Sequence, residues 1–274
     1  MTLYVPDFQV MGVLNVTPDS FSDGGHYTQL DAALMRARER VAAGADWLDI
    51  GGESTRPGAA EVSEQAELER VMPVLEAVRR ELPVKVSVDT SKANVMRSAI
   101  AAGAGMINDV RALQEPGALQ AISESDVRVC LMHMQGQPRT MQEQPSYSNV
   151  VADVKEFLSE RLQACTEAGI RRERVVLDPG FGFGKSLDHN YQLLQQLESL
   201  HDLGRPLLVG ISRKSMLGKI TGRPTAERQA ASVAAATIAA MKGAQYLRVH
   251  DVRETVDAVA VAKATLSAAR TKKD

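Results

Sequence analysis

The 274-residue sequence predicts a single (β/α)8 TIM barrel with long loops after its first and second strands. Short apolar or β-branched runs alternate with longer helix-period runs along the chain, about eight times in all. The strand-like runs are nearly continuous hydrophobic stretches, which are typical of parallel strands buried on both faces. The length also lies near the roughly 250 residues usual for this barrel. We therefore expect one domain over residues 1–274.

The expected strands are distributed evenly from the beginning of the chain to its end. They are QVMGVLNV (9–16), WLDIGG (47–52), VKVSVDT (84–90), MINDV (106–110), VRVCLMHM (127–134), VVLDPG (175–180), LLVGIS (207–212) and YLRVHDV (246–252). Helical periodicity fills the intervals and is clearest at 30–44, 63–82 and 150–169. Strands that alternate with helices in this way indicate parallel pairing through crossover connections.

A weak internal repeat supports the barrel. GADWLDIG (44–51), GAGMINDV (103–110) and GAQYLRVH (243–250) each place a glycine where a helix ends, then an alanine, then a strand that ends in polar residues. Each repeat predicts a return from a helix to a strand. A doubly wound open sheet is the alternative fold, because it is built from the same βα unit.

The composition gives no sign of a nucleic-acid or membrane partner. The formal net charge is −2 and the pI is about 6.2, whereas either partner would require a strongly basic face. The alanine-rich run at 231–241 is too short to cross a bilayer. The two cysteines, Cys130 and Cys165, lie in apolar runs and suit a reducing compartment better than a disulfide framework. We expect a cytoplasmic protein.

Polar residues follow almost every expected strand, at the end where barrel enzymes carry their active sites. In strand order they are Asn15; Asp49, Glu53, Thr55 and Arg56; Asp89; Asn108 and Asp109; His133; Asp178; Ser212, Arg213 and Lys214; and Arg248 and His250. We therefore expect the functional site at this face.

Hydrogen-bond acceptors and cationic side chains are predicted on different sides of that face. Asp89, Asn108 and Asp178 follow the third, fourth and sixth strands, and their oxygens suit a ligand rich in N–H donors, such as a 2-amino heterocycle.

The opposite arc suits an anion. It comes from the seventh, eighth and first strands, which become neighbours when the barrel closes, and it carries Lys214, Arg248, His250 and Asn15. Phosphate or diphosphate is the expected ligand. Asn15 together with substrate phosphates could hold a magnesium ion, because this cation needs few protein ligands.

Each of these assignments has a simpler structural alternative. Asp89 could cap the following helix, and Lys214 could belong to a solvated helix start, although a cation there opposes the helix dipole. His133 is more typical of a satisfied core or loop histidine than of a ligand. The scattered histidines and cysteines predict no zinc site.

The glycine-rich stretch DPGFGFGKS (178–186) resembles a phosphate loop but fits neither standard pattern. A Walker loop would need glycine at Pro179, and a dinucleotide fingerprint would need one at Lys185 or Leu187. We therefore do not expect Lys185 to bind phosphate.

Seven blocks together resemble the dihydropteroate synthase family of pterin-binding enzymes. They are MGVLNVTPDSFSDGG (11–25), DIGGESTRPGA (49–59), SVDTSK (87–92), INDV (107–110), LDPGFGFGKS (177–186), GISRKSMLG (210–218) and RVHDV (248–252). The resemblance covers nearly the whole chain. It implies a (β/α)8 barrel that joins 6-hydroxymethyl-7,8-dihydropterin diphosphate to p-aminobenzoate and releases diphosphate and 7,8-dihydropteroate.

The resemblance also implies a role for individual residues. The pterin-binding residues would be Asp89, Asn108, Asp178, Lys214 and Arg248. The diphosphate-binding residues would be Asn15, Thr55, Arg248 and His250, with Asn15 as the ligand of Mg²⁺. The p-aminobenzoate-binding residues would be Phe21, Arg56, Pro57 and Ser215, and this pocket would also admit sulfonamides. A homodimer is expected from the resemblance alone.

The resemblance leaves two points open. The glycines of 178–186 either let the backbone pass beside the flat pterin or shape a turn. The rival functions are a pterin-dependent methyltransferase and a pterin-binding protein without catalysis. Neither rival needs the cationic SRKS segment (212–215) in the way that a diphosphate-releasing enzyme does.

Overall fold

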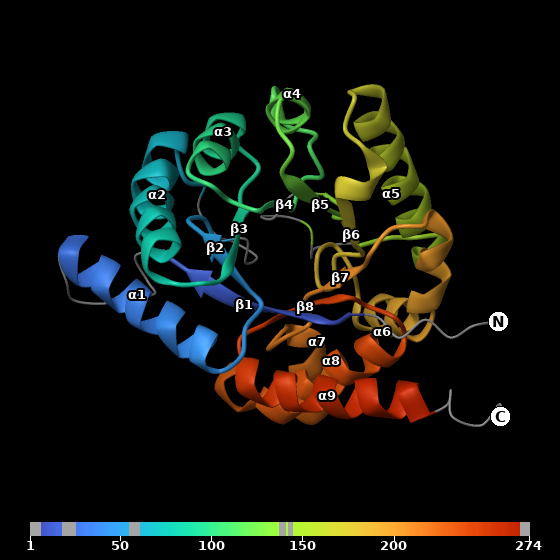
Figure 1. The fold of residues 1–274 in the computed structure, drawn as a ribbon. Coiled ribbons are helices and arrows are strands. Elements are labelled where there is room, and N and C mark those ends of the chain that lie inside the picture. Colours follow the sequence, from blue (N-terminus) through green and yellow to red (C-terminus); the bar gives the residue numbers. More distant parts are fainter. Residues whose placement is uncertain (1–6, 18–25, 55–60, 137–140, 142–144, 269–274) are drawn as a thin grey trace.

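The computed structural model describes residues 7–17, 26–54, 61–136, 141 and 145–268. Eight parallel strands form one curved sheet, surrounded by helices (Figure 1), in the order β6-β5-β4-β3-β2-β1-β8-β7. A bridge between Leu177 and Leu207 joins the remaining pair, β6 and β7. The (β/α)8 barrel is confirmed, and the open-sheet alternative is wrong.

The strands occupy the expected places but are shorter than the apolar runs. They are β1 (Gln9–Asn15), β2 (Trp47–Gly51), β3 (Lys85–Asp89), β4 (Met106–Asp109), β5 (Arg128–Met132), β6 (Val175–Asp178), β7 (Leu208–Val209) and β8 (Tyr246–Val249). The largest difference is β7, because the chain turns away after it to begin the Ser212–Ser215 segment.

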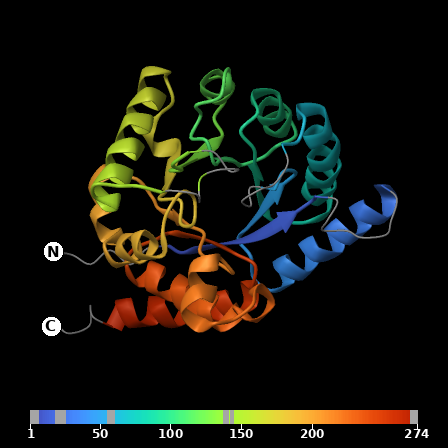
Figure 2. The same cartoon turned by 180° about the vertical axis from the view of Figure 1, so that it is seen from behind.

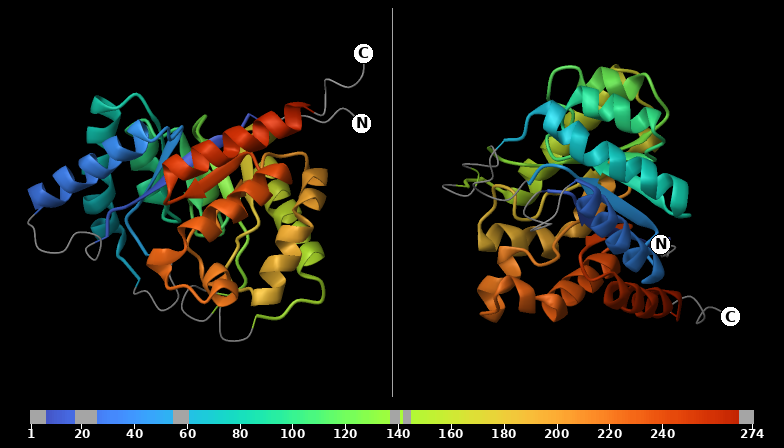
Figure 3. Two further views of the ribbon diagram at one scale, coloured as in Figure 1. Left: turned by 90° about the horizontal axis from the view of Figure 1, so that it is seen from below. Right: turned by 90° about the vertical axis from the view of Figure 1, so that its left-hand side faces the viewer.

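Helices cover the outer face of the sheet in every view (Figures 2 and 3). They are α1 (His26–Ala42), α2 (Glu64–Glu81), α3 (Ala93–Ala101), α4 (Ala118–Ser123), α5 (Val150–Glu167), α6 (Leu187–Gln195), α7 (Ser215–Thr221), α8 (Gln229–Met241) and α9 (Val252–Ala268). Two separate helices, α7 and α8, lie between the last two strands. Gly222 ends α7 in the left-handed region, and Pro224 follows soon after. Among the described helices, none is long and apolar enough to cross a membrane.

The hydrophobic core has two layers, one on each side of the sheet. The outer layer packs the strands against the helices. The inner layer fills the barrel and consists of Met11, Trp47, Met106, Cys130, Val176, Leu208 and Tyr246. Both cysteines are buried and free.

The inner layer also positions the site. Because strand side chains alternate between faces, the residue two places after each inner-layer residue also faces the barrel interior. Asp49, Asn108, Asp178 and Arg248 occupy such positions. The interior of the barrel is therefore apolar toward the amino ends of the strands and polar at their carboxyl ends.

Candidate active site

Charged side chains from three strands meet inside the upper end of the barrel. Arg248 Nε lies 2.6 Å from Asp49 Oδ2, and its Nη2 lies 3.0 Å from Asp89 Oδ2. Asn108 Nδ2 donates to the same Asp49 oxygen at 3.2 Å. The structure thus brings together three of the five predicted pterin-binding residues.

Asp89 does not cap a helix, so the alternative assignment for this residue is wrong. The residue that caps α3 is Lys92, and no side-chain hydrogen bond accompanies it. Burial raises the pKa of the Asp89 carboxyl to about 8, and the guanidinium of Arg248 opposes that shift. A buried acid whose pKa is strongly raised is typical of a functional site.

Asp178 and Lys214 belong to the opposite wall. Asp178 Oδ1 accepts a 2.7 Å hydrogen bond from Gly180 N, which leaves Oδ2 for another donor. Lys214 Nζ donates to the carbonyl oxygen of Phe181 and lies 4.4 Å from the centre of the Phe183 ring. Burial lowers the pKa of Lys214 to about 8, opposed by the nearby Asp178. Lys214 is the N-cap residue of α7, as the simpler alternative supposed, but its ammonium group bonds to the loop after β6.

The glycines of 178–186 shape a turn. Gly180, Gly182 and Gly184 all have positive φ angles, of 70°, 78° and 60°. A Cβ on Gly180 would overlap the carbonyl oxygen of His133, and one on Gly184 would overlap that of Gln135. The loop after β6 therefore packs tightly on the loop after β5.

Lys185 holds this turn from inside, because its ammonium group is bonded to the protein. Its Nζ donates to the carbonyl oxygens of Gly180 and Phe183, at 2.9 and 3.1 Å, and lies 2.8 Å from His133 Nδ1. His133 also packs edge-on against the ring of Phe157. His133 is thus a satisfied core histidine, as expected.

We predict that Gly180→Ala lowers the free energy of unfolding much more than Gly204→Ala does. Both glycines have positive φ, but an added Cβ at Gly204 meets nothing within 4 Å. The control should lose about 1 kcal/mol from backbone strain, and Gly180→Ala about 3 kcal/mol more because His133 must move. Urea titration monitored by circular dichroism measures both values. Equal losses would show that the contact with His133 is unimportant.

The loop after β7 contacts the residues that follow β8. The cations and acceptors are not separated as predicted, because Arg248 pairs with Asp49 and Asp89. Arg213 makes a two-bond ion pair with Asp251, at 2.5 and 3.2 Å, and has a left-handed φ of 59°. Ser212 Oγ lies 3.0 Å from His250 Nδ1. Burial lowers the pKa of His250 to about 4, and Arg248 lowers it further, so this imidazole is neutral at pH 7. It can donate a hydrogen bond to an anion without carrying charge.

Asn15 lies at the rim, in one row with Asp89. Asn15 pairs with Gly51 across β1 and β2, and Gly51 pairs with Asp89 across β2 and β3. A Cβ on Gly51 would lie 3.7 Å from Asn15 Oδ1 and 3.6 Å from Asp89 Cβ. The absence of a side chain at Gly51 leaves a cradle between the Asn15 amide and the Asp89 carboxyl.

The sequence is similar to those of pterin-binding enzymes. The family described as "Pterin binding enzyme" matches residues 11–250. The dihydropteroate synthase of Escherichia coli (strain K12) is 55% identical over 264 residues, which cover 96% of this chain and 94% of that protein. The dihydropteroate synthase of Haemophilus influenzae is 54% identical over 98% of this chain and 97% of its own length.

The chain belongs to the dihydropteroate synthase family. Solved structures agree with this assignment. The Yersinia pestis dihydropteroate synthase in a sulfonamide drug complex superimposes with a TM-score of 0.92 at 56% identity, over 97% of each chain. The Xanthomonas albilineans enzyme in complex with 7,8-dihydropteroate gives 0.86 at 50% identity, over 97% of this chain and 95% of that one. The resemblance inferred from the seven sequence blocks is confirmed.

Not every family site residue predicted here can be located. Thr55, Phe21, Arg56 and Pro57 lie outside the described residues. Ser215 is the first residue of α7 and is exposed. The p-aminobenzoate site therefore stays a prediction. The predicted pterin residues, and the predicted diphosphate residues other than Thr55, lie at the open end of the barrel.

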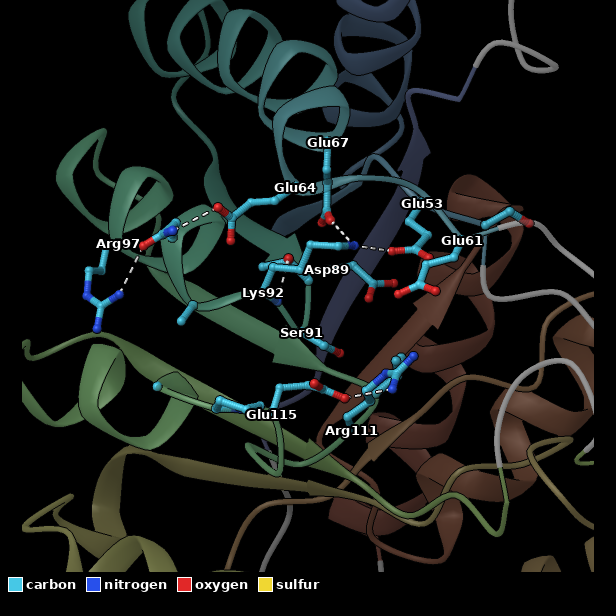
Figure 4. A pocket seen from close by; sticks show the side chains of 17 residues that line it. Glu53, Glu61, Glu64, Glu67, Asp89, Ser91, Lys92, Arg97, Arg111 and Glu115 are labelled. Atoms are coloured by element: carbon cyan, nitrogen blue, oxygen red, sulfur yellow. Dashed lines mark hydrogen bonds and ion pairs between the residues drawn. The ribbon is translucent and has the colours of Figure 1, made fainter.

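A pocket beside Asp89 contains residues to which the sequence analysis gave no role. It has a volume of about 410 Å³ and lies where β2 and β3 lead into α2 and α3 (Figure 4). Lys92 Nζ bridges Glu53 and the buried Glu67, the latter at 2.6 Å. Glu53 also accepts from the backbone N–H of Val62 at 3.3 Å. These contacts fix the wall of the site next to Asp89.

Proposed function

We propose that this chain condenses 6-hydroxymethyl-7,8-dihydropterin diphosphate with p-aminobenzoate, giving 7,8-dihydropteroate and diphosphate. The observation that carries the proposal is the arrangement of the upper barrel, where buried acceptors on β3, β4 and β6 face cations on β8 and the loop after β7. A ligand with N–H donors at one end and an anion at the other fits this arrangement.

The acceptors would bind the pterin ring. Asp89, Asn108 and Asp178 would accept hydrogen bonds from ring nitrogens, and Lys214 would donate to the carbonyl side. Arg248 would lie against the ring and reach the phosphate. The support is the burial of Asp89, Asn108 and Asp178 at one end of the barrel, where water competes weakly for their hydrogen bonds.

The geometry favours departure of diphosphate before the amine attacks. In their ionised forms, Asp89 and Asp178 would stabilise positive charge that spreads from the exocyclic methylene into the ring, while Arg248 and neutral His250 would bind the leaving diphosphate. No protein nucleophile is needed for such an SN1-like route. The amine of p-aminobenzoate is unprotonated at neutral pH, so it requires alignment and desolvation more than a strong base.

p-Aminobenzoate would bind above the pterin, between Phe21, Arg56 and Pro57 and the start of α7 at Ser215. Sulfonamides would compete there because they mimic its shape and charge. The Yersinia pestis relative is described as a complex with a sulfonamide drug, which supports this assignment. Displacement of bound p-aminobenzoate by a sulfonamide is the direct test.

Mg²⁺ is the proposed cofactor, with Asn15 as its protein ligand. The fit rests on the amide oxygen of Asn15 beside the cradle at Gly51. Within the described residues, no group of three or more His, Cys, Asp or Glu side chains could hold a metal alone. A single amide oxygen from the protein suits magnesium, because this ion keeps bound waters and binds substrate phosphates. When bound, the ion would neutralise charge on the diphosphate.

We predict that Asn15→Ala raises the Mg²⁺ concentration needed for half-maximal diphosphate binding about tenfold or more, because the one protein oxygen is lost. Calorimetric titration of diphosphate at several Mg²⁺ concentrations measures this without turnover. Asn94→Ala, at an exposed position on α3, is the control and should leave the dependence unchanged. An unchanged dependence in Asn15→Ala would exclude Asn15 as the ligand.

The function itself is tested by product analysis. The protein, Mg²⁺ and dihydropterin diphosphate should yield dihydropteroate only when p-aminobenzoate is present. Tight pterin binding without any product would instead support a pterin-dependent methyltransferase or a non-catalytic pterin-binding protein.

We further propose a cytoplasmic homodimer. Exposed apolar side chains on α7 and α8, namely Ile220, Ile238 and Met241, provide a surface that a second copy could cover. Light scattering of the purified protein gives the mass that decides between monomer and dimer.

A further inference from the structure

Asp49 lies beneath the predicted pterin pocket and is completely buried. It comes from the middle of β2, while its partners come from β4 and β8 (Figure 1). One oxygen, Oδ2, accepts from both Asn108 Nδ2 and Arg248 Nε, at 3.2 and 2.6 Å. Asp49 therefore touches two groups proposed to contact the substrate.

The contact with Asp49 fixes which end of the Asn108 amide faces the ligand. A carboxylate can only accept hydrogen bonds, so the amide must turn its NH2 group toward Asp49. The carbonyl oxygen of Asn108 is then the atom that remains for the substrate. Without Asp49, the amide could rotate and present a donor to a ligand that also donates.

The same oxygen orients Arg248. Nε is held by Asp49 and Nη2 reaches Asp89 at 3.0 Å, so the plane of the guanidinium is set by two carboxylates. The remaining N–H groups of Arg248 can then reach the substrate from a fixed position. Asp49 thus acts on Asn108 directly and on Asp89 through Arg248.

The other oxygen of Asp49 has no such use. Among the described residues, Asp49 Oδ1 and Ser87 Oγ are buried and without a hydrogen-bond partner. The two residues are register partners on β2 and β3. An unsatisfied buried acceptor lowers stability, so the carboxylate at this position is costly for the fold.

We propose that Asp49 is a positioning residue that sets the donor and acceptor pattern of the pterin pocket. The inference rests on the proposed function, because it assigns the selectivity of that site to a residue below it. Asp49 leaves the carbonyl oxygen of Asn108 as an acceptor for the ligand. It also holds the guanidinium of Arg248 in the plane in which Nη2 reaches Asp89. The pocket then selects a ligand that presents N–H donors.

Three variants separate this role from packing. Asp49→Leu removes the acceptor while filling the space. Asp49→Asn keeps an acceptor oxygen and loses the charge, and its new NH2 group can face Ser87 Oγ. Ser87→Ala is the matched control, since it alters a buried residue at the same level of the barrel that holds neither Asn108 nor Arg248.

The readouts are the Kd for dihydropterin diphosphate and the preference over the corresponding lumazine, in which a carbonyl oxygen replaces the 2-amino group. Asp49→Leu should raise the pterin Kd about 30-fold or more and reduce the preference about tenfold, because a buried charge partner is lost and the amide can rotate. Asp49→Asn should raise the Kd about threefold to tenfold, keep the preference, and melt no lower than the parent. Ser87→Ala should bind as the parent does.

The outcomes decide between the two proposals. A parent protein that binds no pterin overturns the proposed function and this inference together. A parent that binds, with an Asp49→Leu variant that retains both its affinity and its preference, overturns this inference alone. Should Asp49→Leu not fold, Asp49→Ser replaces it, because its short hydroxyl cannot reach Asn108 or Arg248, and the same criteria apply.

Discussion

Asp178→Asn should lower kcat/KM for dihydropterin diphosphate about 1000-fold, which corresponds to about 4 kcal/mol of lost stabilisation. The backbone N–H of Gly180 already uses one carboxylate oxygen, at 2.7 Å. The asparagine oxygen can keep that bond, so the loop after β6 should remain folded. The amide NH2 then faces the substrate in place of the second oxygen, and a donor meets a donor.

Diphosphate release and dihydropteroate formation, each with and without p-aminobenzoate, measure this loss. The matched control is Asp188→Asn, which makes the same change at an exposed position in the first turn of α6. The control should retain parental kinetics, and both variants should melt near the parental temperature. If Asp178→Asn retains activity within about tenfold of the control, Asp178 does not read the pterin, since a lost charged hydrogen bond costs more than this.

The fold and the residues at the strand ends could be predicted because both depend on local sequence. A buried parallel strand is a short apolar run, and the residues that follow it must lie at the same face of the barrel as those after every other strand. Asp89, Asn108, Asp178 and Arg248 could therefore be grouped without knowledge of any contact.

The contacts among these residues could not be predicted, because they join distant parts of the chain. Arg248 and Asp49 are separated by 199 positions, and Lys92 meets Glu53 from 39 positions away. Sequence pattern placed Asp49 at a strand end but could not show that its side chain supports Asn108. A helical period alone also does not reveal that Gly222 ends α7. Residues that act through others are therefore the hardest to find from sequence.

Lys214→Met should lower kcat/KM for dihydropterin diphosphate about 100-fold to 1000-fold, as expected when a positioned donor to a reacting ligand is removed. Methionine retains the apolar stem that lies beside Gly182. The loss should therefore reflect the missing ammonium group and not a cavity. Lys219→Met, at an exposed position on the same helix, is the control and should be neutral.

The pH dependence provides a second test of Lys214. Burial lowers the pKa of its ammonium group to about 8, opposed by Asp178, so the donor is charged below that pH and lost above it. In the parent, kcat/KM should fall as the pH rises through about 8. Lys214→Arg keeps a charged donor over the whole range, so this alkaline decline should disappear even if the maximal rate is lower. Asp89 has a pKa in the same range and gains charge as the pH rises, so the comparison with Lys214→Arg, and not the parental profile alone, tests Lys214. An alkaline decline that persists in Lys214→Arg would mean that another group controls it.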